Sequence, residues 1–430
     1  MVQTSQTVNG SGATVRRAAN FGLIILTLVN LFNYIDRWLV AALVESLRRS
    51  ELHLSDFQAG SLTTGFIIVY LLASPIFGRL GDRGSRTRLI ACGVALWSVA
   101  TALGGLARGF ISLFLARSTV GVGEAAYGTI APALLADYYP LKMRGRVFAV
   151  FFAAIPIGSA MGYILGGYVD QHYGWRAAFY VAGLPGLLLA GLVLTLYDPP
   201  RGAQDENETG PVVLPVAQAD SAWLAYRDLL HNRPYLLTVL GYAAYTFAVG
   251  GLAFWMPAFL ERVRGVPKSE ATIEFGSIVV ATGFIGTFVG GWVGDYCLKF
   301  SKQAYLWVSG IATLAAAPLT LAALAVNRPS VYFTTLVAAQ LLIFASTGPV
   351  NSAIVNYVAP HERATAIALS IFAIHILGDV PSPALIGAIS GASSLGRAVL
   401  IVPVAVLIAG IIWIVGALRK ESASPDMITA

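Results

Sequence analysis

The sequence predicts an all-α integral membrane protein with 12 transmembrane helices in two pseudo-symmetric six-helix bundles. Three observations lead to this fold class. Hydrophobic residues make up 57% of the 430 residues and charged residues only 12%, whereas soluble proteins carry about 25% charged residues. The apolar residues gather in segments long enough to cross a bilayer. Finally, short signatures in the first half of the chain recur in the second half.

Twelve apolar segments reach the roughly 20 residues that a helix needs to cross the hydrocarbon core. They lie at residues 20–44, 57–80, 88–108, 110–137, 146–169, 175–197, 234–260, 273–297, 304–326, 330–356, 364–390 and 396–418. The longest polar interruption divides them into six and six. We therefore expect a flexible tail at 1–19, an N-terminal bundle at 20–197, a cytoplasmic linker at 198–233, a C-terminal bundle at 234–419 and a second tail at 420–430.

Lysine and arginine in the loops predict the orientation, because short cytoplasmic loops are enriched in these residues. With both termini in the cytoplasm, 17 of the 28 basic residues lie on the cytoplasmic side and 9 on the opposite side. The remaining two, Arg37 and Arg117, lie within spans. We expect a protein of the cell (inner) membrane with cytoplasmic termini. Its net charge of +6 comes from these loops and does not indicate binding to nucleic acid.

Two signatures repeat between the halves at nearly the same offset. Gly78-Arg-Leu-Gly-Asp82 ends the second span, and Gly291-Trp-Val-Gly-Asp295 ends the eighth, 213 residues later. Asp137-Tyr138 follows the fourth span, and Asn356-Tyr357 follows the tenth, 219 residues later. Parallel repeats of this kind place the substrate site of a transporter near the membrane midplane, between the halves.

The loop after the second span orders its glycines and charges as Gly78-Arg-Leu-Gly-Asp82-Arg83-Gly84-Ser-Arg86-Thr-Arg88. This order resembles the loop signature of the major facilitator superfamily of transporters. With the span count and the repeat, the resemblance covers essentially the whole chain. It implies that Gly78, Asp82, Arg83, Arg86 and Arg144 form a latch that holds the halves in one state, with Asp82 meeting a helix N-terminus or Arg144. The alternative is a solvated loop that only sets the orientation.

Three further segments resemble the Spinster group within that superfamily. They are Asn33–Arg37 in the first span, Arg117–Ala125 in the fourth and His375–Pro383 in the eleventh. The resemblance implies substrates with one acyl or alkyl chain and a polar head, such as lysophospholipids and sphingosine-1-phosphate-like molecules.

The fifth span repeats glycine at every fourth position, at Gly158, Gly162 and Gly166. This spacing lets two helices approach closely. A fifth span rich in glycine and proline also resembles the antiporter motif of the superfamily, although close packing explains the pattern equally well.

Four charges lie inside spans, namely Asp36, Arg37, Arg117 and Glu124. A charge at the centre of a membrane helix costs roughly 2.5–3.5 kcal/mol, so such residues face a cavity, pair with each other or move protons and substrates. Arg117 and Glu124 are seven residues apart and share a helix face, with Gly121 expected to clear space between them. We expect Glu124 and Asp36 to compete for the two arginines, with Glu124 carrying the proton. The alternative is an ion quartet that only fixes helix packing.

The C-terminal half offers aromatic and neutral polar groups in place of these charges. The substrate-binding candidates of spans 7 and 10 are Tyr242, Tyr245, Thr347 and Asn351. In span 11, His375 and Asp379 are four residues apart and share a face, as a structural pair, a second proton site or a gate contact. One charged and one aromatic half suit an amphipathic substrate whose head lies toward Arg37 and Arg117.

These features predict a secondary active transporter that moves a lipid-like substrate by alternating access, coupled to protons. Efflux of another organic solute or drug is the alternative. The sequence contains no Ser/His/Asp arrangement, His/Cys metal cluster or ATP-binding motif, so we expect neither an enzyme nor a cofactor or metal. The expected partners are the small amphipathic substrate, protons and membrane lipids, with the chain acting as a monomer.

Overall fold

The computed structural model describes residues 6–204, 227, 229–358 and 363–419. At residues 6–15, 141, 142, 144–146, 149, 355 and 363–365 it describes only the backbone. Every regular element in these ranges is helical. Eleven helical segments in them are long and apolar enough to cross a membrane, which confirms the predicted fold class.

The predicted N-terminal bundle corresponds to six helices. They are α1 (Gln6–Arg49), α2 (Asp56–Arg83), α3 (Arg86–Gly104), α4 (Phe110–Tyr138), α5 (Leu141–Tyr173) and α6 (Trp175–Leu194). Residues 6–19 continue the first span as helix, in the segment where the sequence predicts a flexible tail at 1–19. Once a helix is nucleated, each added residue gains a hydrogen bond, and the polar composition of residues 6–19 does not end it.

The fourth span differs from the others in composition. α4 has 29 residues, a length of about 44 Å, yet it is not among the eleven apolar segments. Arg117, Glu124 and Asp137 lower its mean hydropathy, and all three side chains are buried. A helix that neighbouring helices shield can carry charges that a lipid-exposed helix cannot. With α4 included, all twelve predicted spans have a helical counterpart.

Spans 7 to 9 are continuous helices, whereas spans 10 to 12 are interrupted. The continuous helices are α8 (Arg233–Arg262), α9 (Lys268–Cys297) and α10 (Ala304–Ala325). Span 10 consists of α11 (Pro329–Ala345) and α12 (Thr347–Asn356). Span 11 consists of α13 (Arg363–Ile374), the π-helix η2 (His375–Asp379) and α14 (Pro381–Ala392), and span 12 of α15 (Leu395–Ala398) and α16 (Ile401–Leu418). Most of the predicted linker and the tail at 420–430 lie outside the described residues.

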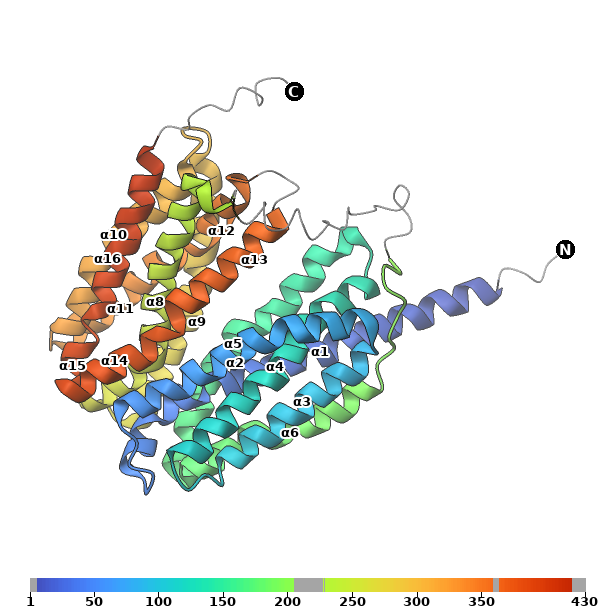
Figure 1. Cartoon of the computed structure of the whole chain (residues 1–430), viewed down its shortest axis with the longest axis horizontal. Helices are drawn as coiled ribbons and strands as arrows, with labels where there is room; N and C mark the ends of the chain where they lie inside the picture. Colours follow the sequence, from blue (N-terminus) through green and yellow to red (C-terminus); the bar gives the residue numbers. More distant parts are fainter. Residues whose placement is uncertain (1–5, 205–226, 228, 359–362, 420–430) are drawn as a thin grey trace. The chain divides into compact units, whose positions relative to one another are not determined.

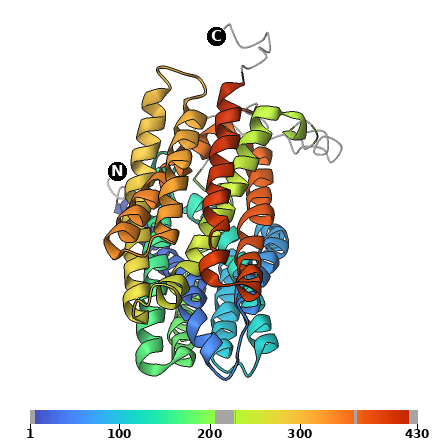
Figure 2. The same cartoon turned by 90° about the vertical axis from the view of Figure 1, so that its left-hand side faces the viewer.

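The chain forms two compact units that do not coincide with the predicted halves. Unit 1 comprises Met1–Leu214, Ala253–Val280 and Pro383–Ala398, and unit 2 comprises Pro215–Leu252, Ala281–Ser382 and Val399–Ala430. One end of α8, one end of α9 and most of α14 therefore pack with the first six helices. Figure 1 shows α1 to α6 running alongside one another within unit 1. Within unit 2, α10 packs beside α11 and beside α16, the long red helix in Figure 2.

Unit 1 has two ends, which we name by their turns. The 49–56 side carries the turn from α1 to α2, and the 83–86 side carries the turn from α2 to α3. On the 49–56 side a capping box fixes the start of α2, because Ser55 Oγ accepts from the Gln58 amide and Gln58 Oε1 accepts from the Ser55 amide. This arrangement satisfies two backbone donors that a helix start leaves unpaired.

Glycines on α5 bring it close to α1. A Cβ atom added at Gly158 would lie 2.6 Å from the carbonyl oxygen of Leu31, and one added at Gly162 would lie 2.7 Å from that of Ile35. Both distances are shorter than real Cβ contacts allow. The Gly-xxx-Gly spacing therefore produces close backbone packing, and it fixes α1 in the position from which its charged residues reach α3 and α4.

We predict that Gly162→Ala lowers the stability of the protein in detergent, because the new methyl group must separate α5 from α1. Overpacking of this kind costs about 1–3 kcal/mol. Gly191→Ala on α6 is the matched control, since nothing lies within 4 Å of a Cβ atom there. The apparent melting temperature of the purified variants measures the effect. An equal melting temperature for both variants would contradict this account of the packing.

Candidate substrate and proton site

The first buried ion pair joins α1 to α4 and α3. Arg117 on α4 donates from Nη1 to Oδ1 of Asp36 on α1 over 3.1 Å, and Thr101 on α3 donates to Oδ2 over 2.9 Å. All three residues are buried. Both oxygens of Asp36 are thus satisfied, and removing one member of such a pair leaves an uncompensated buried charge at a cost of about 3–5 kcal/mol. This geometry is that of a structural contact.

The second ion pair has one open side. Arg37 on α1 donates to Oε2 of Glu124 on α4, from Nη2 over 2.7 Å and from Nε over 3.2 Å. The Glu124 side chain is fully buried, whereas 25% of the Arg37 side chain is exposed. The guanidinium carbon lies 5.1–5.3 Å from the ring centroids of Tyr34, Phe66 and Tyr70. Cation–π attraction holds the guanidinium among these rings and leaves part of it accessible.

The carboxylate of Glu124 is only half satisfied. Its Oε2 atom accepts both bonds from Arg37, while Oε1 is buried and has no hydrogen-bond partner among the described residues. An unsatisfied buried acceptor is costly, more so when it carries charge. Unlike Asp36, Glu124 thus has an oxygen on which a proton or a water molecule would be accommodated.

The structure separates the two carboxylates that we expected to compete for two arginines. Asp36 pairs with Arg117 and Glu124 pairs with Arg37. Adjacent residues on a helix point about 100° apart, so each member of the Asp36–Arg37 dipeptide reaches its own partner. Gly121 does not clear space between these charges, because a Cβ atom there would lie 2.5 Å from the Phe66 carbonyl oxygen on α2. It lets α2 and α4 pack closely.

The four candidates from spans 7 and 10 come together in unit 2. Asn351 on α12 donates from Nδ2 to the Tyr242 hydroxyl over 3.2 Å, and the hydroxyls of Tyr245 and Thr347 are 2.9 Å apart. The Tyr242 and Tyr245 rings lie 5.7 Å apart on α8. Asn351 is exposed, whereas Tyr245 is buried. Tyr242 and Thr347 are partly exposed, so they and Asn351 are the members of this group that a solute could reach.

His375 and Asp379 form a pair within the π-helix η2. Nδ1 of His375 lies 2.9 Å and 3.0 Å from the two carboxylate oxygens of Asp379. Gly378 lets this segment approach α8, since a Cβ atom there would lie 2.9 Å from the Ala243 carbonyl oxygen. The irregular turn falls on these residues, just before α14 begins at Pro381. π-helical turns are frequent at functional sites.

Among the five expected latch residues, Arg86 makes the most contacts. It is buried, donates from Nη1 to Asp137 at the end of α4, and donates from Nε to Oδ1 of Asp198 over 2.8 Å. Its backbone amide donates to Oδ2 of Asp198 over 2.8 Å. Arg86 therefore joins α3, the end of α4 and the start of the predicted linker.

The other latch candidates are less constrained in the described part of the chain. Asp82 and Arg83 are exposed, and their side chains form no hydrogen bond or ion pair with another described residue. A Cβ atom at Gly78 would be in ordinary contact, 3.6 Å from Thr129. The side chain of Arg144 lies outside the described residues, so its expected meeting with Asp82 stays a prediction.

Several polar residues on the 83–86 side were not among our candidates. Besides Asp137 and Asp198, Arg201 donates from Nη2 to the carbonyl oxygens of Gly81 over 2.6 Å and Gly84 over 2.8 Å. It thereby satisfies carbonyl groups that the end of α2 leaves unpaired. Asp137 was visible in the sequence as part of a repeat, but Asp198 and Arg201 carried no signal beyond their position after a span.

Comparison with known proteins extends to both sequence and fold. Residues 26–378 match the sequence signature of the Major Facilitator Superfamily. Mouse protein spinster homolog 1 is 35% identical over 390 residues, covering 86% of this chain and 72% of the mouse protein. The Xenopus tropicalis sphingosine-1-phosphate transporter SPNS2 is 31% identical over 433 residues, covering 94% and 82%. The Drosophila melanogaster protein spinster is 34% identical over 390 residues, and the chain spans 63% of its length.

The fold agrees with these sequence likenesses. A crystal structure of a bacterial homolog to the human lysosomal transporter spinster, inward-facing and unoccupied, matches with a TM-score of 0.84 and 25% identity over 94% of this chain and 99% of that chain. A structure of such a homolog in the occupied conformation matches with a TM-score of 0.80. The chain therefore belongs to the major facilitator superfamily of membrane transporters and, within it, to the spinster group.

Proposed function

We propose that this transporter moves an amphipathic lipid with an anionic head, such as a lysophospholipid or a sphingolipid-like molecule, together with protons. The Arg37–Glu124 pair is the observation that carries the proposal. It combines a partly exposed cation with a buried carboxylate, one oxygen of which has no hydrogen-bond partner among the described residues. A relative named for sphingosine-1-phosphate transport supports the lipid class.

The surroundings of Arg37 suit a lipid head that ends in phosphate. A guanidinium has five N–H donors in a planar fork that matches phosphate oxygens. In the described part of the chain, Arg37 directs its bonds to one oxygen of Glu124. Its Nη1 group remains available, and the rings of Tyr34, Phe66 and Tyr70 offer apolar contact to the first carbons of a chain.

Competition for Arg37 supplies a mechanism of coupling. When an anionic head binds the guanidinium, Glu124 loses part of its compensation while it stays buried. A buried carboxylate without a cation favours its neutral form, so Glu124 takes up a proton as the head binds. When the head leaves, Arg37 attracts the carboxylate again and the proton departs. Alternating access requires that these two events occur on opposite sides of the membrane.

We propose that the aromatic and polar group within unit 2 also binds substrate. Tyr242 and Asn351 offer it a hydroxyl and an amide as neutral hydrogen-bonding groups. His375 and Asp379 form the proposed second proton site. We place the 83–86 side and both termini in the cytoplasm of a monomeric inner-membrane protein, in agreement with the bias of lysine and arginine in the loops.

We predict that Glu124→Gln removes proton-driven movement of a labelled lysophospholipid in proteoliposomes, because glutamine cannot exchange a proton. Glu51→Gln is the control, since Glu51 lies outside the helices and its side chain is largely exposed. The measurement is lipid movement under an imposed pH gradient, with empty liposomes as background. Movement by the Glu124→Gln protein equal to that of the control would contradict the proposed coupling.

The same assay separates the lipid proposal from its alternative. If the wild-type protein moves no lysophospholipid or sphingosine-1-phosphate above background but moves a soluble organic anion or a drug under the gradient, then the substrate class is wrong and the coupling site stands.

The two buried pairs are predicted to respond differently to mutation. Asp36→Asn leaves Arg117 buried and uncompensated, so it lowers the free energy of unfolding by about 3–5 kcal/mol. Glu124→Gln leaves Arg37, which is partly exposed and surrounded by aromatic rings, and lowers stability less. The apparent melting temperatures of both variants in detergent check this order. A larger loss for Glu124→Gln would show that the Arg37 pair is the main structural contact.

A further inference from the structure

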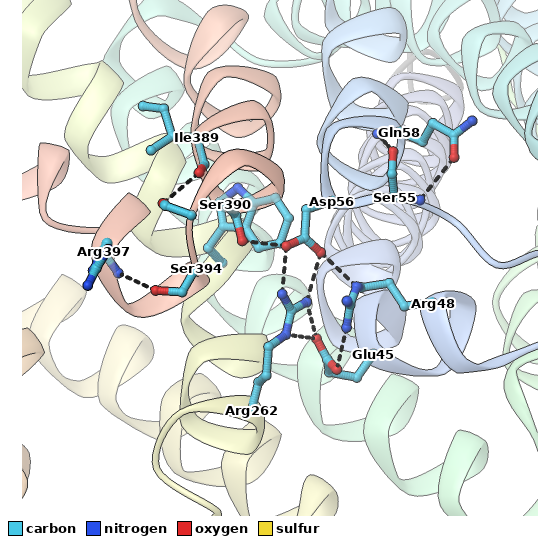
Figure 3. Close-up of polar contacts among 12 residues, drawn as sticks. Glu45, Arg48, Ser55, Asp56, Gln58, Arg262, Ile389, Ser390, Ser394 and Arg397 are labelled. Carbon is cyan, nitrogen blue, oxygen red and sulfur yellow. Dashed lines mark hydrogen bonds and ion pairs between the residues drawn. The ribbon is translucent and has the colours of Figure 1, made fainter.

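A cluster of six charged residues lies on the 49–56 side of unit 1 and includes the last turns of α1, the helix that also carries Arg37. Three are acidic and three basic: Glu45, Arg48, Arg49, Asp56, Glu261 and Arg262. We refer to them as the six-residue cluster, of which Figure 3 labels Glu45, Arg48, Asp56 and Arg262. In our sequence analysis the three arginines counted only among the basic residues that predict the orientation, and the three acidic residues were not candidates.

Arg262, at the end of α8, is the centre of this cluster. It donates from Nε to Oε1 of Glu45 over 2.7 Å, and to the two oxygens of Asp56 over 2.6 Å from Nη1 and 2.9 Å from Nη2. Both carboxylates are buried. Figure 3 shows the Arg262 guanidinium between them, with Arg48 on the other side and Ser390 of α14 donating to Asp56. A fork-shaped guanidinium is suited to such bridging, and lysine is not.

The cluster joins parts of the chain that are distant in sequence. Glu45 and Asp56 come from the first two spans, whereas Arg262 and Ser390 come from the seventh and eleventh. A second ionic contact, between Arg49 and Glu261 at 2.9 Å, makes the same connection. On this side, the ends of the C-terminal spans are therefore held to the N-terminal helices.

Close backbone packing accompanies the ion pairs. A Cβ atom at Gly387 on α14 would collide with the carbonyl oxygen of Asp56, one at Gly60 on α2 with that of Pro383, and one at Gly167 on α5 with the side chain of Thr272 on α9. Tyr163 on α5 also donates to the Ala253 carbonyl oxygen over 2.6 Å. Gly60, Gly167 and Gly387 therefore allow close helix contacts on the 49–56 side, beside the six-residue cluster. We call these three contacts the glycine seam.

We infer that the six-residue cluster and this glycine seam are the gate that closes the transport path on the 49–56 side, and that Arg262 is its principal positioning residue. The inference rests on the proposed alternating-access function. Two buried carboxylates share one guanidinium, so separating the helices breaks at least four hydrogen bonds together. Contacts of this kind favour one of two discrete arrangements over intermediate ones.

The cluster makes no contact with the Arg37 pair and has a different task. Arg37 and Glu124 belong to α1 and α4, with Phe66 and Tyr70 of α2 beside Arg37, whereas the gate also draws on α8 and α14. The gate determines which conformation is populated, and the Arg37 site determines what is bound and whether a proton accompanies it. A variant of the gate should therefore shift the conformational population and leave the binding chemistry intact.

The test uses a cysteine placed inside the seam. Thr272→Cys is introduced after Cys92 and Cys297 have been replaced by serine, and the protein is placed in lipid nanodiscs, where both faces are accessible. Thr272 is buried in the closed arrangement, so a hydrophilic maleimide reacts with the new cysteine only when the seam opens. The rate of alkylation reports the open population without any transport measurement.

We expect Arg262→Ala to raise the alkylation rate roughly tenfold or more, and Arg262→Lys to give an intermediate rate because a single ammonium cannot bridge both carboxylates. Arg176→Ala is the matched control. Arg176 forms an ion pair with Glu51 on the same side, over 2.5 Å, but within the first six spans. Equal rates for Arg262→Ala, Arg176→Ala and the parent would overturn the inference.

A second pair of variants tests the seam without changing a charge. Gly387→Ala places a methyl group against the Asp56 carbonyl and should raise the alkylation rate, whereas Gly391→Ala, one turn along α14, meets nothing within 4 Å and should not. These variants carry the test if Arg262→Ala does not fold. Altered rates together with a lack of lipid transport by the wild type would refute the proposed substrate and keep the gate. Unaltered rates in a protein that transports lipid would refute the gate.

Discussion

Pairing of charge inside the hydrocarbon region is the constraint on which the rest of this structure depends. An isolated charge in the core of a bilayer is costly, and this chain places four of them on α1 and α4. The requirement that each finds a partner fixes the rotation of both helices. It also explains why α4 packs against α2 and α3. The charged residues of α1 must lie close to α4, and the glycines of α5 allow α1 to pack tightly in that position.

The two ion pairs differ in how fully their carboxylates are hydrogen-bonded, and this difference gives them different roles. Asp36 has both oxygens satisfied by Arg117 and Thr101 in a fully buried environment. Glu124 keeps one oxygen without a partner among the described residues, and its arginine is partly exposed. The first pair therefore behaves as a fixed part of the bundle. In the second pair, Glu124 Oε1 is an atom that a proton would bind, and Arg37 is a cation that an anionic head would bind. A proton-coupled transporter needs both groups in one contact.

The membrane spans and the residues of the buried ion pairs could be predicted from the sequence, because each depends on residues that are close together along the chain. Apolar length predicts the spans, and isolated charges within them predict the residues of the buried pairs. Which carboxylate pairs with which arginine could not be predicted, since it depends on the rotation of α1 against α4. The role of Gly121 was misjudged for the same reason, because its helical face meets α2 and not the charges.

Contacts between segments that are distant in sequence were the hardest features to predict. Glu45, Asp56 and Arg262 lie at the ends of three spans, where charged residues are expected in any membrane protein, and no spacing links them. Asp198 and Arg201 likewise gained a role only when the structure placed them against Arg86 and the end of α2. The π-helical turn at His375–Asp379 likewise lies where Gly378 packs against α8. Such features arise from tertiary packing, which a pattern along one chain does not contain.

The central claim is that binding of an anionic head at Arg37 is linked to protonation of Glu124. Calorimetric titration of the purified transporter with a lysophospholipid, repeated in buffers of different ionisation enthalpy, measures this link directly. The account predicts that about one proton is taken up for each lipid bound. Lipid binding of undiminished affinity with no proton uptake in any buffer would contradict it.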